Sequence, residues 1–225
     1  MSLTIGIYDL FAYTIPGILY LYVVYEFLRR IGAVHIEFSN IPDISSGIGL
    51  LIIALVVVAS HLAGHLFDFF ALGLASRLVK RQSPTIALER VLERFPNLGI
   101  QFRVKDWDLL FSLLRQRNPE HSRIIDSFGA NSIMFRNIFF GLLLLTLIQV
   151  YSLVASYNHV TLIVTIGIVI FCYVAFQRSR LFHLWFYGDI FESSLDYGKS
   201  LEEVVAYGKG RDRKPAKNVL KKNEK

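Results

Sequence analysis

The chain has 225 residues, of which 53% are hydrophobic and 19% are charged; its formal net charge is +6 and its mean hydropathy is +0.45. It is too apolar for an ordinary soluble domain and too short for a large transporter. The single cysteine, Cys172, excludes an intrachain disulfide. The composition therefore predicts a small all-α protein that crosses a membrane several times.

Four apolar stretches meet or approach the length of about 20 residues that a helix needs to cross a bilayer. They are residues 5–28, 48–79, 138–155 and 160–176. We expect the first stretch to be retained, because no basic residue precedes it and Asp9 lies inside it. Each stretch is predicted to form one transmembrane helix, and the last two helices to form a hairpin.

Lysine and arginine are distributed unequally between the segments that join the spans. All but two of the 24 basic residues lie in the large middle loop with its flanks or after the fourth stretch; the exceptions are Arg29 and Arg30. Basic loops are retained on the cytoplasmic side of a membrane. We therefore expect a multi-pass protein of the inner (plasma) membrane, with both termini and the middle loop in the cytoplasm.

Outside the spans the pattern changes to shorter and more polar elements. We expect transmembrane helices 1 and 2 in residues 1–80, a cytoplasmic helical insert in 81–131, a transmembrane hairpin in 132–180, a cytoplasmic amphipathic helix in 181–207 and a disordered basic tail in 208–225. An insert of about 50 residues buries little core by itself. We expect it to pack on the ends of the spans or on copies of itself.

The second apolar stretch carries a polar stripe at helical spacing. Its members are Ser60, His61, Gly64, His65 and Asp68. Small residues allow membrane helices to approach closely, and ionisable groups in a bilayer normally face a partner or water. Packing between helices, a metal site and a proton or ion path all remain open. We favour packing and predict no metal and no other cofactor, because the usual metal-binding patterns are absent.

Further polar residues lie near the predicted cytoplasmic ends of the spans. Besides His65 and Asp68 they are Asp9, Arg136, Asn137, Arg178 and Arg180. If these side chains share one depth, two interpretations use the same residues: an interhelical network of ion pairs and hydrogen bonds, or the cytoplasmic mouth of a pore. We favour the network. His61 then lies one turn deeper than the rest and is not explained by it.

The C-terminal tail carries the candidate lipid-binding residues. They are Lys209, Arg211, Arg213, Lys214, Lys217, Lys221 and Lys222. Basic residues just inside a membrane attract anionic headgroups by about 1 kcal/mol each, so we expect contact with lipid and no direct binding of nucleic acid. The small residues of the second stretch predict a homo-oligomer, and the insert leaves room for a soluble cytoplasmic protein partner.

Catalytic motifs with correct spacing are missing from the sequence. Ser179, Arg180 and His183 are similar to a motif of membrane lipid phosphatases, but the gaps differ and the companion motifs are missing. There is also no P-loop, no dinucleotide-binding turn and no GxSxG elbow. We predict a protein that is not an enzyme, and a membrane enzyme acting on lipid remains an alternative.

Three short motifs carry a resemblance to a known group of proteins. They are Asp9 followed by Pro16-Gly17, Gly64-His65, and Phe135-Arg136-Asn137. Together they resemble small multi-span bacterial membrane proteins, some of which are encoded in phage-defence loci beside soluble partners. The resemblance implies a non-enzymatic membrane component that senses infection or damages the membrane. The residues alone leave a second alternative, an ion or proton channel or transporter subunit that uses the polar stripe.

Overall fold

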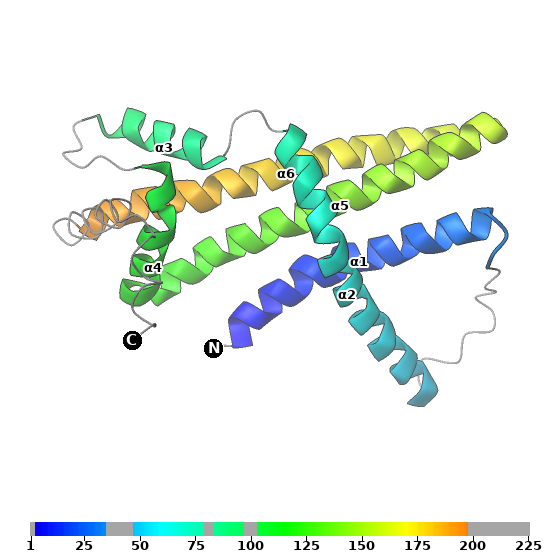
Figure 1. Cartoon of the computed structure of the whole chain (residues 1–225), viewed down its shortest axis with the longest axis horizontal. Coiled ribbons are helices and arrows are strands. Elements are labelled where there is room, and N and C mark those ends of the chain that lie inside the picture. The colour runs from blue at the N-terminus through cyan, green and yellow to red at the C-terminus, as the bar shows by residue number, and fades with distance from the viewer. Residues whose placement is uncertain (1–2, 35–46, 79–82, 97–102, 198–225) are drawn as a thin grey trace, which may run out of the picture. The chain divides into compact units, whose positions relative to one another are not determined.

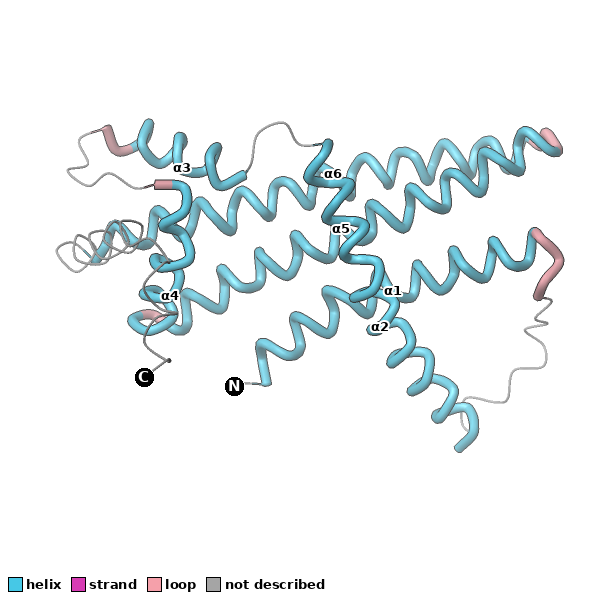
Figure 2. Tube along the Cα trace, viewed as in Figure 1, coloured by secondary structure: helices cyan, strands magenta, loops and turns pink. Residues whose placement is uncertain are grey.

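The computed structural model describes residues 3–34, 47–78, 83–96 and 103–197 of the chain. These residues are almost entirely helical, and no strand occurs among them, which confirms the all-α prediction. The elements, traced in Figures 1 and 2, are α1 (Leu3–Arg30), α2 (Gly47–Leu78), α3 (Ser83–Arg94), η2 (Val104–Asp106), α4 (Trp107–Arg117), α5 (Pro119–Ala155), α6 (His159–Ser194) and η3 (Leu195–Tyr197).

Four of these helices, α1, α2, α5 and α6, are long and apolar enough to span a membrane. Their large apolar side chains are mostly exposed: on α2, Leu62 is 64% exposed and Phe69 is 77% exposed. The buried residues of α2 are all small, namely Gly49, Ser60, Gly64 and Ala71. Small residues inside and large apolar residues outside are typical of helices packed in lipid.

Helices α5 and α6 are longer than the apolar stretches that predicted them. They contain 37 and 36 residues. The amphipathic helix expected from residue 181 is therefore not a separate element, because its described part continues α6 to Ser194. No glycine or proline occurs between residues 177 and 187, so nothing ends the helix where the apolar stretch ends. Likewise, the boundary expected after residue 131 falls inside α5.

The chain divides into two compact units. Unit 1 comprises Met1–Lys80 and Asp126–His183, and unit 2 comprises Arg81–Ile125 and Leu184–Lys225. This division differs from the predicted one, because the insert shares its unit with the C-terminal end of α6. The basic tail, from Lys209 to Lys222, lies outside the described residues.

Unit 2 has an apolar core of the kind found in soluble proteins. The core consists of Ala87, Leu88 and Val91 of α3, Leu110, Phe111 and Leu114 of α4, Ile125 of α5, and Ile190 and Phe191 of α6. Positions 87, 88 and 91 follow the three- and four-residue spacing of an amphipathic helix. The insert is too small for a core of its own, and α6 completes that core with Ile190 and Phe191.

Within unit 1, α1 and α2 cross near their midpoints (Figure 1). Gly17 of α1 lies against the backbone carbonyl of Ser60, and Gly64 of α2 lies against the backbone carbonyl of Tyr13. A Cβ atom at either glycine would collide with these backbone atoms. The two helices can approach this closely only because both positions lack a side chain.

Candidate functional site

The two small members of the polar stripe of α2, Ser60 and Gly64, pack on α1 within the same chain. Ser60 is 0% exposed and donates a hydrogen bond from Oγ to the carbonyl oxygen of Val56, at 2.7 Å. Gly64 is the second buried member of the stripe and lies at the crossing. The small-residue face from which we predicted self-association is therefore occupied by α1. Homo-oligomerisation stays a prediction, and it would have to use another face.

A histidine cluster lies at the same crossing. It consists of Tyr13, Thr14, His61 and His65. Thr14 Oγ1 lies 3.3 Å from Nδ1 of His61, and Nε2 of His61 lies 3.2 Å from Nε2 of His65. The Tyr13 ring stacks on the His65 ring with 3.7 Å between the centroids. His61 is half-buried and His65 is exposed, so the cluster runs from the helix contact to the surface of unit 1.

Asp68 and Arg136 join α2 to α5. Oδ1 of Asp68 lies 2.6 Å from an Nη atom of Arg136, and the two side chains are 21% and 14% exposed. Beside this ion pair, Tyr20 of α1 donates a hydrogen bond to the carbonyl oxygen of Asn137, at 2.8 Å. Its ring stacks on Phe67 with 4.5 Å between the centroids. These five residues form a three-helix junction of α1, α2 and α5.

The three-helix junction contains more hydrogen-bond donors than it uses. Nε of Arg136 and Nδ2 of Asn137 are buried and have no acceptor among the described residues. A buried donor without a partner destabilises a fold by about 1–3 kcal/mol. The Asp68 carboxylate, as the counter-charge of Arg136, is therefore central to the stability of the junction.

Along α1, Asp9 of the predicted rim network and the three-helix junction lie several turns apart. The junction lies beside Tyr20, in the middle third of α1, whereas Asp9 precedes Tyr20 by three turns, or about 16 Å along the axis. The side chain of Asp9 lies outside the described residues. Interhelical contacts set the register and place Asp68 away from the end of α1 that bears Asp9. That the rim residues share one depth in a membrane stays a prediction.

The two arginines of α6 do not join the three-helix junction in the described structure. The guanidinium of Arg180 lies over the Phe176 ring, 5.9 Å from its centroid. Arg178 is exposed and has no ion-pair partner within the described ranges. Near them, the hydroxyls of Ser132 and Ser179 each donate to the backbone carbonyl of the other residue, at 3.1 and 2.9 Å. This reciprocal pair links α5 to α6 without any charge.

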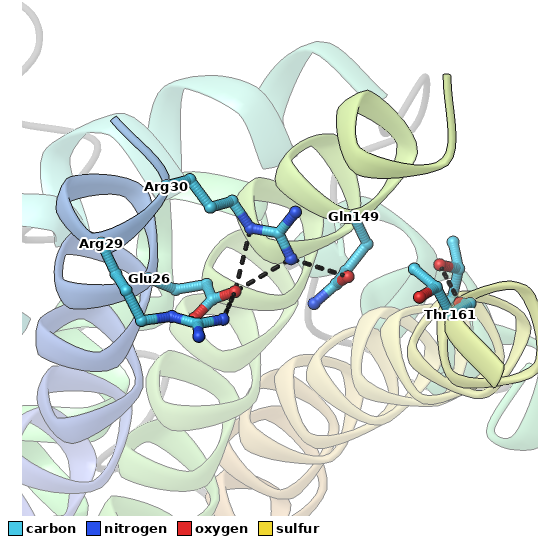
Figure 3. Close-up of polar contacts among 6 residues, drawn as sticks. Glu26, Arg29, Arg30, Gln149 and Thr161 are labelled. Carbon is cyan, nitrogen blue, oxygen red and sulfur yellow. Dashed lines mark hydrogen bonds and ion pairs between the residues drawn. The ribbon is translucent and has the colours of Figure 1, made fainter. Parts of the chain in front are cut away.

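A second polar cluster, which our sequence analysis missed, lies at the C-terminal end of α1 (Figure 3). Glu26 is 4% exposed, and its carboxylate accepts hydrogen bonds from Arg29 and Arg30, the shortest of 2.9 Å from each. Arg30 also donates to Oε1 of Gln149 on α5, at 3.2 Å. The spacing of Glu26 to the two arginines is a readable helical signal, but Gln149 carries no such signal. Figure 3 shows Thr161 of α6 apart from this cluster.

Unit 2 contains an open groove of about 290 Å³ between α3 and the C-terminal end of α6. Arg90, Arg94, Asp189 and Glu192 line it, and Arg94 pairs with Glu192 at 2.7 Å. The groove therefore combines both signs of charge. Its lining residues do not form a converging set of catalytic groups.

His121 and Ser193 form another polar contact in unit 2. Nε2 of His121 lies 2.8 Å from Oγ of Ser193. A serine nucleophile needs its histidine base to be oriented by a third group. No carboxylate is hydrogen-bonded to His121 among the described residues, so this pair does not form a catalytic triad there.

The three-ligand metal site that the stripe could have formed is not assembled in unit 1. Asp68, which would be the third ligand beside His61 and His65, pairs with Arg136 instead. Across the described ranges, no group of three histidine, cysteine, aspartate or glutamate side chains is arranged to hold a metal ion.

No protein-family model matches the chain, and no curated protein and no solved structure shows significant similarity to it. Its function is therefore inferred from the geometry of the helix crossing, the three-helix junction and the surfaces of the two units.

Proposed function

We propose that this chain is a non-enzymatic inner-membrane component of a bacterial anti-phage defence system. It acts as a sensor or as a membrane-perturbing effector, through homo-oligomerisation and a soluble cytoplasmic partner. Both termini and unit 2 lie in the cytoplasm, in keeping with the distribution of lysine and arginine. The defence setting rests on the resemblance of the short motifs in the three spans.

One observation supports the non-enzymatic role most directly: two groups of charged side chains between the helices of unit 1 neutralise each other in ion pairs. Asp68 pairs with Arg136, and Glu26 pairs with both arginines that follow it. Charged groups in a membrane protein mark either a functional path or a bond between helices. Groups that neutralise each other in close contact favour the second role, and they leave signalling to changes in helix packing.

The α1–α2 crossing is the element through which such a signal would pass. At Gly17 and Gly64 the backbones of the two helices are in direct contact. Close-packed helices of this kind move between discrete arrangements and do not deform continuously. The exposed apolar face of α2, including Leu62 and Phe69, provides a membrane surface for other copies. The charged groove of unit 2 provides a surface for a soluble partner.

Expression in bacteria under an inducible promoter tests the proposal. We expect cells that express the chain with its neighbouring genes to resist phage infection, or a membrane-potential dye to report depolarisation during infection. Gly64→Leu should abolish the effect, because the new side chain meets the Tyr13 backbone. Gly73→Leu is the matched control, because a Cβ at Gly73 meets no atom within 4 Å. The proposal fails if the wild type neither protects nor depolarises under any phage challenge.

The histidine cluster supports a second candidate, an ion or proton path along the polar face of α2. Thr14, His61 and His65 form a continuous chain of hydrogen-bonding atoms across the middle of the helix pair. Imidazoles linked in this way can relay protons. Proton flux into liposomes should then fall in a His61→Ala/His65→Ala variant, and unchanged flux would remove this candidate.

A further inference from the structure

The geometry points to a binding site for an anionic phospholipid in unit 1, with one acyl chain in an apolar groove between α1 and α5 and the headgroup phosphate at Arg29. The site requires only that the chain lies in a membrane, as its four long apolar helices indicate. It is independent of the proposed function, since a defence component could lack it and a protein with another function could contain it.

The apolar groove has a volume of about 270 Å³ and is lined by apolar and aromatic side chains of α1, α2 and α5. Val24 and Phe27 of α1 and Leu147 of α5 are among them, and they are 42%, 53% and 60% exposed. Where the lining of α1 begins, the Tyr20 ring stacks on Phe67. Pockets for whole small ligands usually measure about 300–1,000 Å³, so this groove accepts a segment of one acyl chain.

The opposite end of the apolar groove leads to the charged cluster of Glu26, Arg29 and Arg30 (Figure 3). Arg30 follows the lining residue Phe27 by three positions, or about one helical turn. It donates to Gln149 of α5, at 3.2 Å, and Gln149 directly follows the last lining residue of α5. The polar bond between α1 and α5 therefore lies where the groove ends.

The charged cluster has one positive charge in excess, because the single carboxylate of Glu26 pairs with two guanidiniums. Arg29 is its exposed member, with a side chain that is 52% exposed. Its Nε and one Nη donate to Glu26, and its other Nη has no acceptor among the described residues. Arginine binds phosphate through such donors. An apolar chain and an anionic headgroup thus find matching surfaces side by side.

Arg29 and Arg30 are also the two exceptions in the distribution of basic residues. The other lysines and arginines lie in segments that we expect in the cytoplasm. Because basic residues concentrate on that side of a membrane, two arginines at the opposite end of α1 need a local reason. Glu26 neutralises one of their charges, and a lipid phosphate would neutralise the other. On the proposed topology, this lipid belongs to the outer leaflet.

Photo-crosslinking of the purified full chain in detergent tests the site. The probe is phosphatidylglycerol with a diazirine group in one acyl chain, and peptide mass spectrometry locates the labelled residues. We expect saturable labelling within residues 20–27 and 144–148, which line the groove. Unlabelled phosphatidylglycerol should displace the probe, and phosphatidylcholine should do so about fivefold less well, the factor expected of one basic residue near an anionic headgroup.

Two pairs of variants separate the headgroup contact from the groove. Arg29→Gln should raise the half-saturating probe concentration by about fivefold, and Arg29→Lys, which keeps the charge, by less. Arg178→Gln is the matched control, because Arg178 is an exposed arginine of α6. Val24→Trp fills the groove and should reduce its labelling, whereas Leu62→Trp, on the exposed face of α2, should leave it unchanged.

Labelling of the groove that does not saturate, or that both lipids displace equally, would overturn the assignment, because unspecific boundary lipid behaves in this way. Cross-links between two chains in place of lipid labelling would also overturn it and would assign the groove to a second copy. Circular dichroism and size-exclusion elution identify variants that have lost the fold. If Arg29→Gln loses it, the competition between the two lipids on the wild type decides the question.

Discussion

The α1–α2 crossing in unit 1 and the core of unit 2 bury opposite kinds of side chain. In unit 2 the fully buried residues are large and apolar, such as Leu110 and Phe191, both 0% exposed. In unit 1 the buried face of α2 consists of small residues such as Ser60 and Ala71, while Phe69 of the same helix is 77% exposed. Water drives large apolar groups into a core, but lipid supplies no such force between helices. The α1–α2 crossing is therefore held by close backbone contacts, and polar bonds join it to α5.

This difference predicts that the two units fail in opposite ways. Unit 2 should be destabilised when bulk is removed from its core. Unit 1 should be destabilised when bulk is added at its crossing or when a polar partner is removed. Thermal or denaturant-induced unfolding of the detergent-solubilised chain measures these effects.

Removal of one partner of the Asp68–Arg136 pair should have the largest effect. Arg136→Gln leaves a carboxylate that is 21% exposed without its counter-charge, and breaking a buried pair destabilises by about 3–5 kcal/mol. Asp68→Asn should be similarly harmful. The double variant should recover part of the loss, because no isolated charge remains. Strictly additive effects in this cycle would mean that the two residues do not pair.

Truncation of the unit 2 core should come next. Leu110→Ala removes a side chain that is 0% exposed and should destabilise by about 2–5 kcal/mol. Leu92→Ala is the control, because Leu92 is 40% exposed and surface substitutions usually change stability by less than about 0.5 kcal/mol. Equal effects of the two variants would contradict a water-driven core in this unit.

At the helix crossing, the addition of one methyl group should destabilise the chain, whereas in the unit 2 core it is the removal of side-chain volume that does so. Gly17→Ala places a Cβ against the backbone of Ser60, and overpacking destabilises by about 1–3 kcal/mol. Gly167→Ala, in α6, meets nothing within 4 Å and should be neutral or stabilising, by up to about 1 kcal/mol, because alanine favours a helix over glycine. The same substitution should thus be destabilising at the helix crossing and neutral or stabilising in α6.

The sequence predicted the helices and their contact faces better than it predicted which residues pack against those faces. The composition and the four apolar stretches predicted an all-α chain with four helices that can span a membrane. The stripe predicted that α2 has a close-contact face, and the structure pairs its Asp68 with Arg136. Nothing in the stripe, however, specifies that it packs against Gly17 of α1, because small residues allow any helix to approach closely.

The same limit explains the other differences between prediction and structure. An amphipathic pattern in the insert shows that one face is buried, but not that Ile190 and Phe191 of α6 cover it. The register between the helices is a related case: apolar boundaries give only an approximate depth for Asp68, whereas contacts such as Tyr20 to Asn137 fix which parts of the helices lie together. The ion pairs of Glu26 could have been predicted from the sequence, because Arg29 and Arg30 follow it by three and four positions on one helix.

The smallest expected effect tests whether the three-helix junction is held by hydrogen bonding or by ring packing. Tyr20→Phe removes the hydroxyl that donates to the Asn137 carbonyl, at 2.8 Å, and keeps the ring that stacks on Phe67. Tyr20 is 1% exposed, so the carbonyl is left without this donor, at a loss of about 0.5–1.5 kcal/mol. Tyr20→Leu loses the stacking as well and should be more harmful. If Tyr20→Phe unfolds like the wild type while Tyr20→Leu is destabilised, ring packing alone joins α1 to the junction. The three-helix junction would then be held by the same kind of apolar contact as the core of unit 2.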